Sequence, residues 1–196
     1  MKNLKIALTV LTFILFPALL FGQVLSQNEG YSNAANATVM CKGGFSVTFD
    51  ANKKLLSGTL SGNQAFANGA HATVYCKETT AVAFGAKGEL LSASLSGHQA
   101  FANGAHATVN CKEGTVVTFG VNGELLSAVL SGHQAFANGA HATVNCKEGT
   151  AVTFGVKGEL LSATLSGNQS FANVKNSSVN CLDNTFVRFD ENGKIQ

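Results

Sequence analysis

Thr115-Val-Val-Thr-Phe-Gly-Val-Asn-Gly-Glu-Leu-Leu-Ser-Ala-Val-Leu130 is the stretch of sequence that decides the fold. Its β-branched and aromatic residues alternate between two sides, a period typical of half-buried strands. Asn122-Gly123 is the preferred pair for a two-residue hairpin turn, because both positions need a positive φ. The stretch therefore predicts an antiparallel hairpin with one apolar face, in which Phe119 lies opposite Leu126, Val117 opposite Ala128 and Thr115 opposite Leu130.

A second turn signal follows at Lys147-Glu148-Gly149, where Gly occupies the place that favours a left-handed bulge in a three-residue loop. This loop predicts a hairpin with Val144 opposite Val152 and Cys146 opposite Thr150. Leu125 and its equivalents Leu55, Leu90 and Leu160 are expected to point away from the Phe119 face. The face of the recurring Phe66, Phe101, Phe136 and Phe171 stays open, because it depends on the length of the loop before each of them.

A similar sequence recurs every 35 residues, as shown by the spacing of Cys41, Cys76, Cys111, Cys146 and Cys181. A period of this length is typical of repeat architectures. We expect a tandem-repeat domain over residues 36–196, with four full units (Thr38–Ala72, Thr73–Ala107, Thr108–Ala142, Thr143–Ser177) and a partial one (Ser178–Gln196). The predicted fold is all-β, an elongated antiparallel β-meander of 35-residue repeats. A β-solenoid, in which each unit is one coil, is the alternative.

The first residues predict a targeting signal. Lys2 and Lys5 precede an apolar run from Ile6 to Gly22, which is typical of a secretory signal peptide, so residues 1–22 are expected to be removed. Residues 23–35 are polar and are interpreted as a linker. No later run is long enough to span a membrane. The formal charge of +2 comes from 13 basic and 11 acidic residues, and loss of the two lysines makes the exported chain neutral. That balance argues against nucleic-acid binding.

The hairpins carry a resemblance to a known class. Phe119-Gly-Val-Asn-Gly-Glu-Leu125 and Phe189-Asp-Glu-Asn-Gly-Lys-Ile195 resemble the aromatic-x-x-Asn-Gly-x-Leu hairpin of MORN-type repeats and of bacterial antitoxin-type repeat proteins. The match covers about seven residues of each unit. The resemblance implies β-hairpins joined into an elongated sheet, with scaffolding or with binding of a partner or lipid as the role.

Cysteine and histidine are the residues that would carry metal or redox chemistry. In a single-sheet meander equivalent cysteines would lie about 19 Å apart, too far for a disulfide, whereas a solenoid would bring them close enough to pair. We interpret them as small buried apolar residues. The histidines form two series, His71, His106 and His141, and His98 and His133. Asn36 and Asn63 stand in these series in the first unit, so we interpret them as surface residues and predict no metal ligand.

The carboxylates predict turns rather than catalysis. Glu78, Glu113 and Glu148 follow a lysine in a turn, and Glu89, Glu124 and Glu159 follow a glycine at a hairpin exit. Neither series offers a paired acid and base, and no Gly-x-Ser-x-Gly motif is present. The chain is therefore predicted not to be an enzyme, with no catalytic residue and no cofactor.

The sequence predicts an exported, non-catalytic scaffold that is secreted or held in the cell envelope. Its expected partner is a protein, or a glycan or lipid of the cell surface, bound through identical side chains at regular intervals. The alternative function is a secreted protein that handles metals or redox equivalents through its periodic histidines and cysteines.

Overall fold

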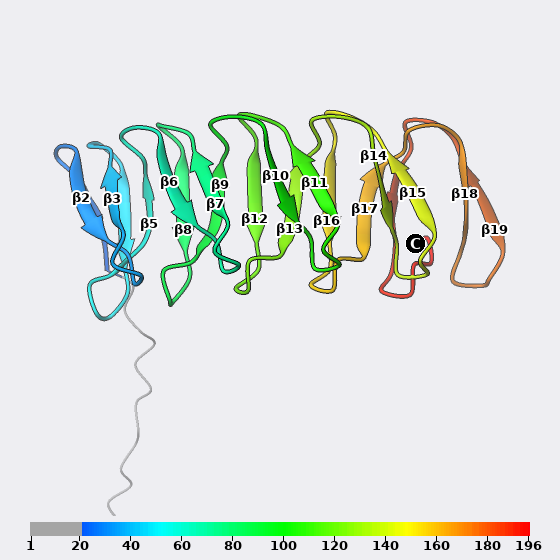
Figure 1. Cartoon of the computed structure of the whole chain (residues 1–196), viewed down its shortest axis with the longest axis horizontal. Helices are drawn as coiled ribbons and strands as arrows, with labels where there is room; N and C mark the ends of the chain where they lie inside the picture. Colours follow the sequence, from blue (N-terminus) through cyan, green and yellow to red (C-terminus); the bar gives the residue numbers. More distant parts are fainter. Residues whose placement is uncertain (1–20) are drawn as a thin grey trace, which may run out of the picture.

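The computed structural model describes residues 21–196, so the predicted signal peptide lies almost wholly outside the described residues. Within them every regular element is a strand, and none of these residues forms a helix that could cross a membrane. The strands build an elongated, open structure of two layers, with similar units side by side along one row (Figure 1). The prediction of an elongated antiparallel β-fold made of regular repeats is confirmed.

The first layer is a ten-stranded antiparallel sheet, which we call the long sheet. Its strands, in spatial order, are β1 (Phe21–Val24), β4 (Ser46–Phe49), β5 (Leu55–Thr59), β8 (Ala81–Phe84), β9 (Leu90–Ser94), β12 (Val116–Phe119), β13 (Leu125–Val129), β16 (Ala151–Phe154), β17 (Leu160–Thr164) and β20 (Phe186–Arg188).

The second layer is a row of five separate two-stranded hairpins. They are β2 (Glu29–Ser32) with β3 (Thr38–Cys41), β6 (Gln64–Ala67) with β7 (Thr73–Cys76), β10 (Gln99–Ala102) with β11 (Thr108–Cys111), β14 (Gln134–Ala137) with β15 (Thr143–Cys146), and β18 (Gln169–Ala172) with β19 (Ser178–Cys181). The chain therefore alternates between the layers and adds one hairpin to each in every unit. Each unit lengthens the long sheet by two strands, or about 9.6 Å.

The core lies between the layers and repeats from unit to unit. The second-layer phenylalanines are buried, and each packs edge to face on a phenylalanine of the long sheet, as Phe101 does on Phe119 with ring centroids 5.0 Å apart. Val109, Cys111, Val117 and Leu130 are completely buried around this pair. The question that the sequence left open is thereby answered, because Phe66, Phe101, Phe136 and Phe171 all face inward.

The hairpin at Asn122-Gly123 forms where it was predicted, and the predicted register holds at Thr118, which lies opposite Ser127. It shifts by one residue at the tip, where Phe119 lies opposite Leu125, so the predicted pairing of Phe119 with Leu126 is wrong. Only Gly123 has a positive φ, and the Gly120 N–H donates to the Glu124 carbonyl, so the loop has three residues and a bulge follows it. The bulge turns Leu125 into the core, where it is completely buried, instead of away from the Phe119 face.

The loop at Lys147-Glu148-Gly149 was predicted to close a hairpin, and this prediction is wrong. β15 pairs with β14, and β16 pairs with β13, so Val144 lies opposite Phe136 and Val152 opposite Ala128. The loop carries the chain from one layer to the other. It is held there because the Lys147 N–H donates to Thr164 O and the Gly149 N–H to Leu130 O, each at 2.9 Å.

Residues 23–35, interpreted from the sequence as a linker, instead continue the repeat. They complete β1 and form β2, and Leu25 is buried in the core. The Tyr31 ring packs on Phe49 with centroids 5.0 Å apart, as Phe66 packs on Phe84 one unit later. Tyr31 replaces the phenylalanine and Glu29 the glutamine of the other units. A comparison by residue identity therefore misses this half unit, although the spacing of its core residues is unchanged.

The two layers are joined at one edge by contacts between turns. The Asn33 side-chain amide donates to the Gly88 carbonyl at 3.0 Å, and the same bond joins Asn68 to Gly123, Asn103 to Gly158 and Asn138 to Gly193. The backbones approach so closely that a Cβ added to Gly123 would lie 2.0 Å from Ala70 N. Glycine is therefore required at this point of each of these four turns.

Candidate binding surface

The outer face of the long sheet carries a line of hydroxyl side chains that runs from strand to strand. Thr118 and Ser127 face each other on β12 and β13, with their side-chain oxygens 2.7 Å apart and hydrogen-bonded. The register between hairpins continues the line, because Thr118 also lies opposite Ser92, and Ser127 opposite Thr153. We call this line the hydroxyl row, made of Thr48, Ser57, Ser92, Thr118, Ser127, Thr153 and Ser162, all of them partly exposed.

The hydroxyl row follows from the sequence alternation. In Val-Thr-Phe of β12, Val117 and Phe119 point into the core, so Thr118 between them must point outward. The same alternation places the hydroxyl pairs Thr48–Ser57 and Thr153–Ser162 at 2.7 and 2.6 Å. Ala83 is the one interruption between Ser57 and Ser92, and Arg188 follows Ser162 at the end of the row.

Charge is almost absent from the strands. In the twenty strands of residues 21–196 only Glu29 and Arg188 are charged, and the other charged side chains lie in the turns and loops. Beside the hydroxyl row the outward positions are uncharged and include exposed apolar side chains, such as Val116 opposite the buried Ser94 and Phe186 opposite Thr164. The broad face of the long sheet is therefore neutral, with charged rims.

The outer face of the second layer is also neutral but offers fewer hydroxyl groups. Its outward pairs are mostly alanine with threonine or asparagine, as in Ala102 opposite Thr108 and Ala100 opposite Asn110. Tyr75 and Met40 are the larger exposed side chains there, at 57% and 43% exposure. Exposed hydroxyl groups also recur once per unit there, as in Thr73, Thr108 and Thr143, but within residues 21–196 hydroxyl side chains that are hydrogen-bonded to each other occur only on the long sheet.

The glutamates of the hairpin exits cover the turns of the long sheet. In the first such turn, Asp50 accepts hydrogen bonds from the backbone N–H groups of Asn52 and Lys54 at 2.8 Å. The next unit has Gly85 in that place, and the Glu89 carboxylate folds back over it and accepts the Lys87 N–H at 3.0 Å. Glu124 and Glu159 lie over Gly120 and Gly155 in a similar position, but within residues 21–196 the Oε2 atom of each is buried without a hydrogen-bond partner. The Asp50 and Glu89 carboxylates therefore hold their turns by hydrogen bonds, whereas Glu124 and Glu159 only cover theirs.

The five cysteines are free thiols in the core. The Cys111 thiol donates to the Val109 carbonyl at 3.4 Å, and burial raises the pKa values of Cys76, Cys111 and Cys146 to about 12. Because each unit adds only two strands to the long sheet, equivalent cysteines lie about 9.6 Å apart, half the distance expected for a single sheet but still too far for a disulfide. A protonated, buried thiol is a poor nucleophile and metal ligand.

The first histidine series has a backbone role. His71, His106 and His141 are exposed and adopt φ values of 58–60° in the second-layer turns, where Asn36 and Asn176 stand in the outer units. Asn, Asp and His are the non-glycine residues most often found in this conformation. His98 and His133 are exposed in other loops. The residues at the equivalent position in the first and fourth units, Asn63 and Asn168, each accept a hydrogen bond from the backbone N–H of the residue 15 positions later. Across residues 21–196 no His, Cys, Asp and Glu side chains cluster as a metal site would require.

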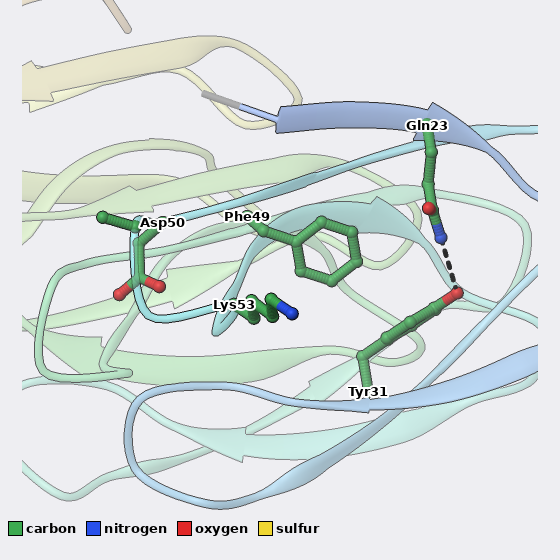
Figure 2. A pocket seen from close by; sticks show the side chains of 6 residues that line it. Gln23, Tyr31, Phe49, Asp50 and Lys53 are labelled. Atoms are coloured by element: carbon green, nitrogen blue, oxygen red, sulfur yellow. Dashed lines mark hydrogen bonds between the residues drawn. The ribbon is translucent and has the colours of Figure 1, made fainter. Parts of the chain in front are cut away.

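One end of the molecule has an open hollow of about 430 Å³. Tyr31, Phe49 and Lys53 line it together with Gln23 and Asp50, and Figure 2 shows the Gln23 amide bonded to the Tyr31 hydroxyl. This bond is 2.9 Å long, and Tyr31 in turn donates to Glu29 at 2.8 Å. The hollow lies beside the 50–54 turn, the one turn of the long sheet that accepts no hydrogen bond from a buried second-layer asparagine within residues 21–196.

Comparison with known proteins finds no matching family model, no matching curated protein and no matching solved structure. Sequence reasoning did not find the hydroxyl row. The Val-Thr-Phe and Leu-Leu-Ser segments of most units carried the signal, and the predicted register placed Thr118 opposite Ser127. The continuation of the row depends on the pairing of neighbouring hairpins, which places Thr118 also opposite Ser92 and Ser127 opposite Thr153.

Proposed function

We propose that this chain is an exported, non-catalytic scaffold of the cell envelope, which binds an extended neutral polymer through the hydroxyl row. The observation that carries the proposal is the row itself, in which Thr48 to Ser162 present donors and acceptors on a face whose strands hold one charge, Arg188. A neutral polysaccharide of the cell surface has the complementary chemistry, because its hydroxyl groups also donate and accept.

The periodicity supports affinity without a strong single site. A polymer that repeats along the row can form the same hydrogen bonds in each unit, so weak contacts add through effective concentration. The lack of charge on this face disfavours nucleic acids and anionic lipids, which proteins bind through basic residues. The resemblance of the Asn-Gly hairpins to MORN-type repeats supports a scaffolding or binding role of the same general class.

The metal- or redox-handling alternative has less support. The thiols that it needs are buried, burial raises the pKa of Cys111 to about 12, and His71, His106 and His141 occupy separate exposed turns. Export is supported by the basic and apolar leader of the sequence. Purified protein is expected to retain its five thiols in reduced form and to bind no stoichiometric metal, and metal analysis with thiol titration tests this.

The polymer proposal is tested by co-sedimentation with an insoluble neutral β-glucan, with insoluble pectate as the anionic probe. We expect binding to the glucan that persists at high salt, because no charge pair contributes. Ser92→Lys and Ser127→Lys, in the middle of the hydroxyl row, are expected to abolish it.

The matched control changes the other broad face. Thr108→Lys and Thr143→Lys introduce the same charge at exposed threonines of the second layer and are expected to leave glucan binding unchanged. Equal loss in both pairs, or preference for pectate, would contradict the assignment of the hydroxyl row as the binding face.

A further inference from the structure

The repeat units stand side by side, and the two end units of this array differ from the interior units in the contacts between turns. We propose that Lys53, reinforced by Val174, prevents a second copy of the chain from docking end to end. Edge strands of an open sheet are templates for pairing with another chain, and the ends of a repeat protein carry this hazard. The proposal assigns the protection to these two side chains.

Inside the row, glycine permits the turns to meet. A Cβ on Gly88, Gly123, Gly158 or Gly193 would lie 2.0–2.2 Å from the backbone nitrogen of an alanine in the facing turn. A Cβ on Gly69 would lie 2.2 Å from Val121 O. Backbone atoms cannot swing aside as side-chain atoms do. All four contacts have glycine in the long-sheet turn. In the contact between Asn33 and Gly88, Ala34 stands in the place of Gly69, so this second-layer turn accommodates one methyl group.

The end turns break this rule on both sides. The 50–54 turn holds Lys53 in the place of these glycines, with a φ of 61°. The 173–177 turn holds Val174 in the place of Gly69, at 65% exposure. If a second copy continued the row, these two residues would face each other. The Lys53 side chain would then fall on backbone of the incoming turn, and it lines the hollow that such a turn would fill (Figure 2).

The remaining groups at the two ends are complementary, which is why a barrier is needed. Inside the row the Lys147 N–H donates to Thr164 O, and the Ser166 N–H to Asn145 O. The equivalent N–H of Leu182 and carbonyl of Asn180 have no such partner within residues 21–196. At the opposite end, Val24 O and Ser26 N–H are the equivalents of Thr59 O and Ser61 N–H one unit earlier. Among the described residues 21–196 they have no partner that corresponds to Lys42 N–H or Met40 O.

Apolar side chains also lie at these ends. Leu182 replaces the lysine of the other units and is 67% exposed, while Phe45 replaces a threonine and is 41% exposed. Lys42 Nζ reaches Thr79 Oγ1 of the next unit at 3.3 Å. By the same geometry Leu182 would reach Gly44, next to Phe45, in a second copy. Backbone groups and apolar surface therefore both favour joining, and Lys53 and Val174 oppose it.

The test is the double variant Lys53→Gly/Val174→Gly, studied by sedimentation velocity on the full chain in the form in which cells accumulate it. The wild-type sedimentation coefficient is expected to stay constant as concentration rises, and that of the double variant to increase. Both positions are exposed in turns, and Gly adopts the φ of residue 53 without strain, so the variant is expected to fold. Val174→Gly alone is expected to remain monomeric, because Lys53 still blocks.

Two further variants identify the contact. Lys87→Gly/Val156→Gly removes exposed side chains of the same types from interior turns and is expected to stay monomeric. Leu182→Pro in the double variant removes the N–H that would bond to Val24 O and is expected to abolish assembly. Wild-type protein that itself assembles through its ends, or a double variant that stays monomeric, would overturn the proposal.

Discussion

The side-chain amide of Asn68 donates a hydrogen bond of 3.0 Å to the backbone carbonyl of Gly123, 55 residues later in the chain. Because a unit has 35 residues, this bond passes over one whole unit and joins the two on either side of it. Asn68 also accepts the backbone N–H groups of Ala70 and Ala72, at 3.1 and 2.9 Å. One buried side chain thus shapes its own turn and fixes it on another layer.

Asn68→Ala is expected to lower the free energy of unfolding by roughly 2 kcal/mol, because it leaves a buried carbonyl and two turn N–H groups without partners. Urea denaturation followed by circular dichroism measures the change. Asn122→Ala, at an exposed position of the turn that Asn68 contacts, is the matched control and should change stability by less than about 0.5 kcal/mol. Equal effects would show that the amide bond does not hold the layers together.

Gly123→Ala is expected to destabilise the protein by about 3 kcal/mol, since the new methyl group would meet Ala70 N and the residue has a φ of 88°. Thermal unfolding detects this loss as a lower Tm. For comparison, Gly132 has no atom within 4 Å of an added Cβ and no positive φ, so Gly132→Ala should leave the Tm almost unchanged. A similar drop in both variants would refute the close contact between turns.

In the second long-sheet turn, an aspartate at position 85 is expected to replace the carboxylate of Glu89. Glu89→Lys removes the acceptor of the Lys87 N–H, and Gly85→Asp places a Cβ 2.2 Å from the Glu89 carboxylate. Each single change should cost about 1 kcal/mol or more. The double variant recreates the Asp50 and Lys54 arrangement of the first unit and should recover most of the stability. A double-mutant cycle of urea midpoints measures the coupling, and simple additivity would contradict the exchange.

Stability is expected to fall at high pH because of the buried thiols. Burial raises the pKa of Cys111 from 9.0 to about 12, so above pH 9 the unfolded thiol releases its proton while the folded thiol keeps it. The free energy of unfolding therefore decreases between about pH 9 and pH 12, by about 1.4 kcal/mol per pH unit for each such thiol. Stability from this source is fully present below pH 9.

Cys111→Ala isolates this contribution, because every other titratable group is common to both proteins. Urea unfolding at pH 8, 9 and 10 should give a shallower pH dependence for the variant than for the wild type, whatever its stability at pH 8. Parallel curves would mean that the thiol is accessible to solvent in the folded protein.

The sequence predicted the class of fold but not the division of each unit between two layers. Asn122-Gly123 correctly marked a hairpin, because a turn is a local property of its own residues. Lys147-Glu148-Gly149 has the same local signature but connects the layers, since Thr164 O and Leu130 O on neighbouring strands capture its N–H groups. Such partners lie outside any local window. Sequence reasoning therefore placed strands well and paired them less well.

The roles of individual side chains follow the same division between local and long-range information. The buried state of Cys111 was predicted from residue type, and the structure agrees. The backbone role of His106 was not, because a φ of 59° becomes visible only when the second-layer turn is known. For residues 23–35, aligning Leu25, Tyr31 and Asn33 with Leu60, Phe66 and Asn68 by spacing rather than by identity would have revealed another half unit.

The near-identity of neighbouring turns has a consequence for how this protein changes over generations. Removing residues 106–140 would bring Ala105 directly before His141, the same pair of residues that Ala105 and His106 form now. Asn103 would then lie the same number of residues before Gly193 as it now does before Gly158, with the same turn geometry. Recombination between such stretches can therefore lengthen or shorten the rod by whole units without creating any new junction, so length is the property that this design leaves free to vary.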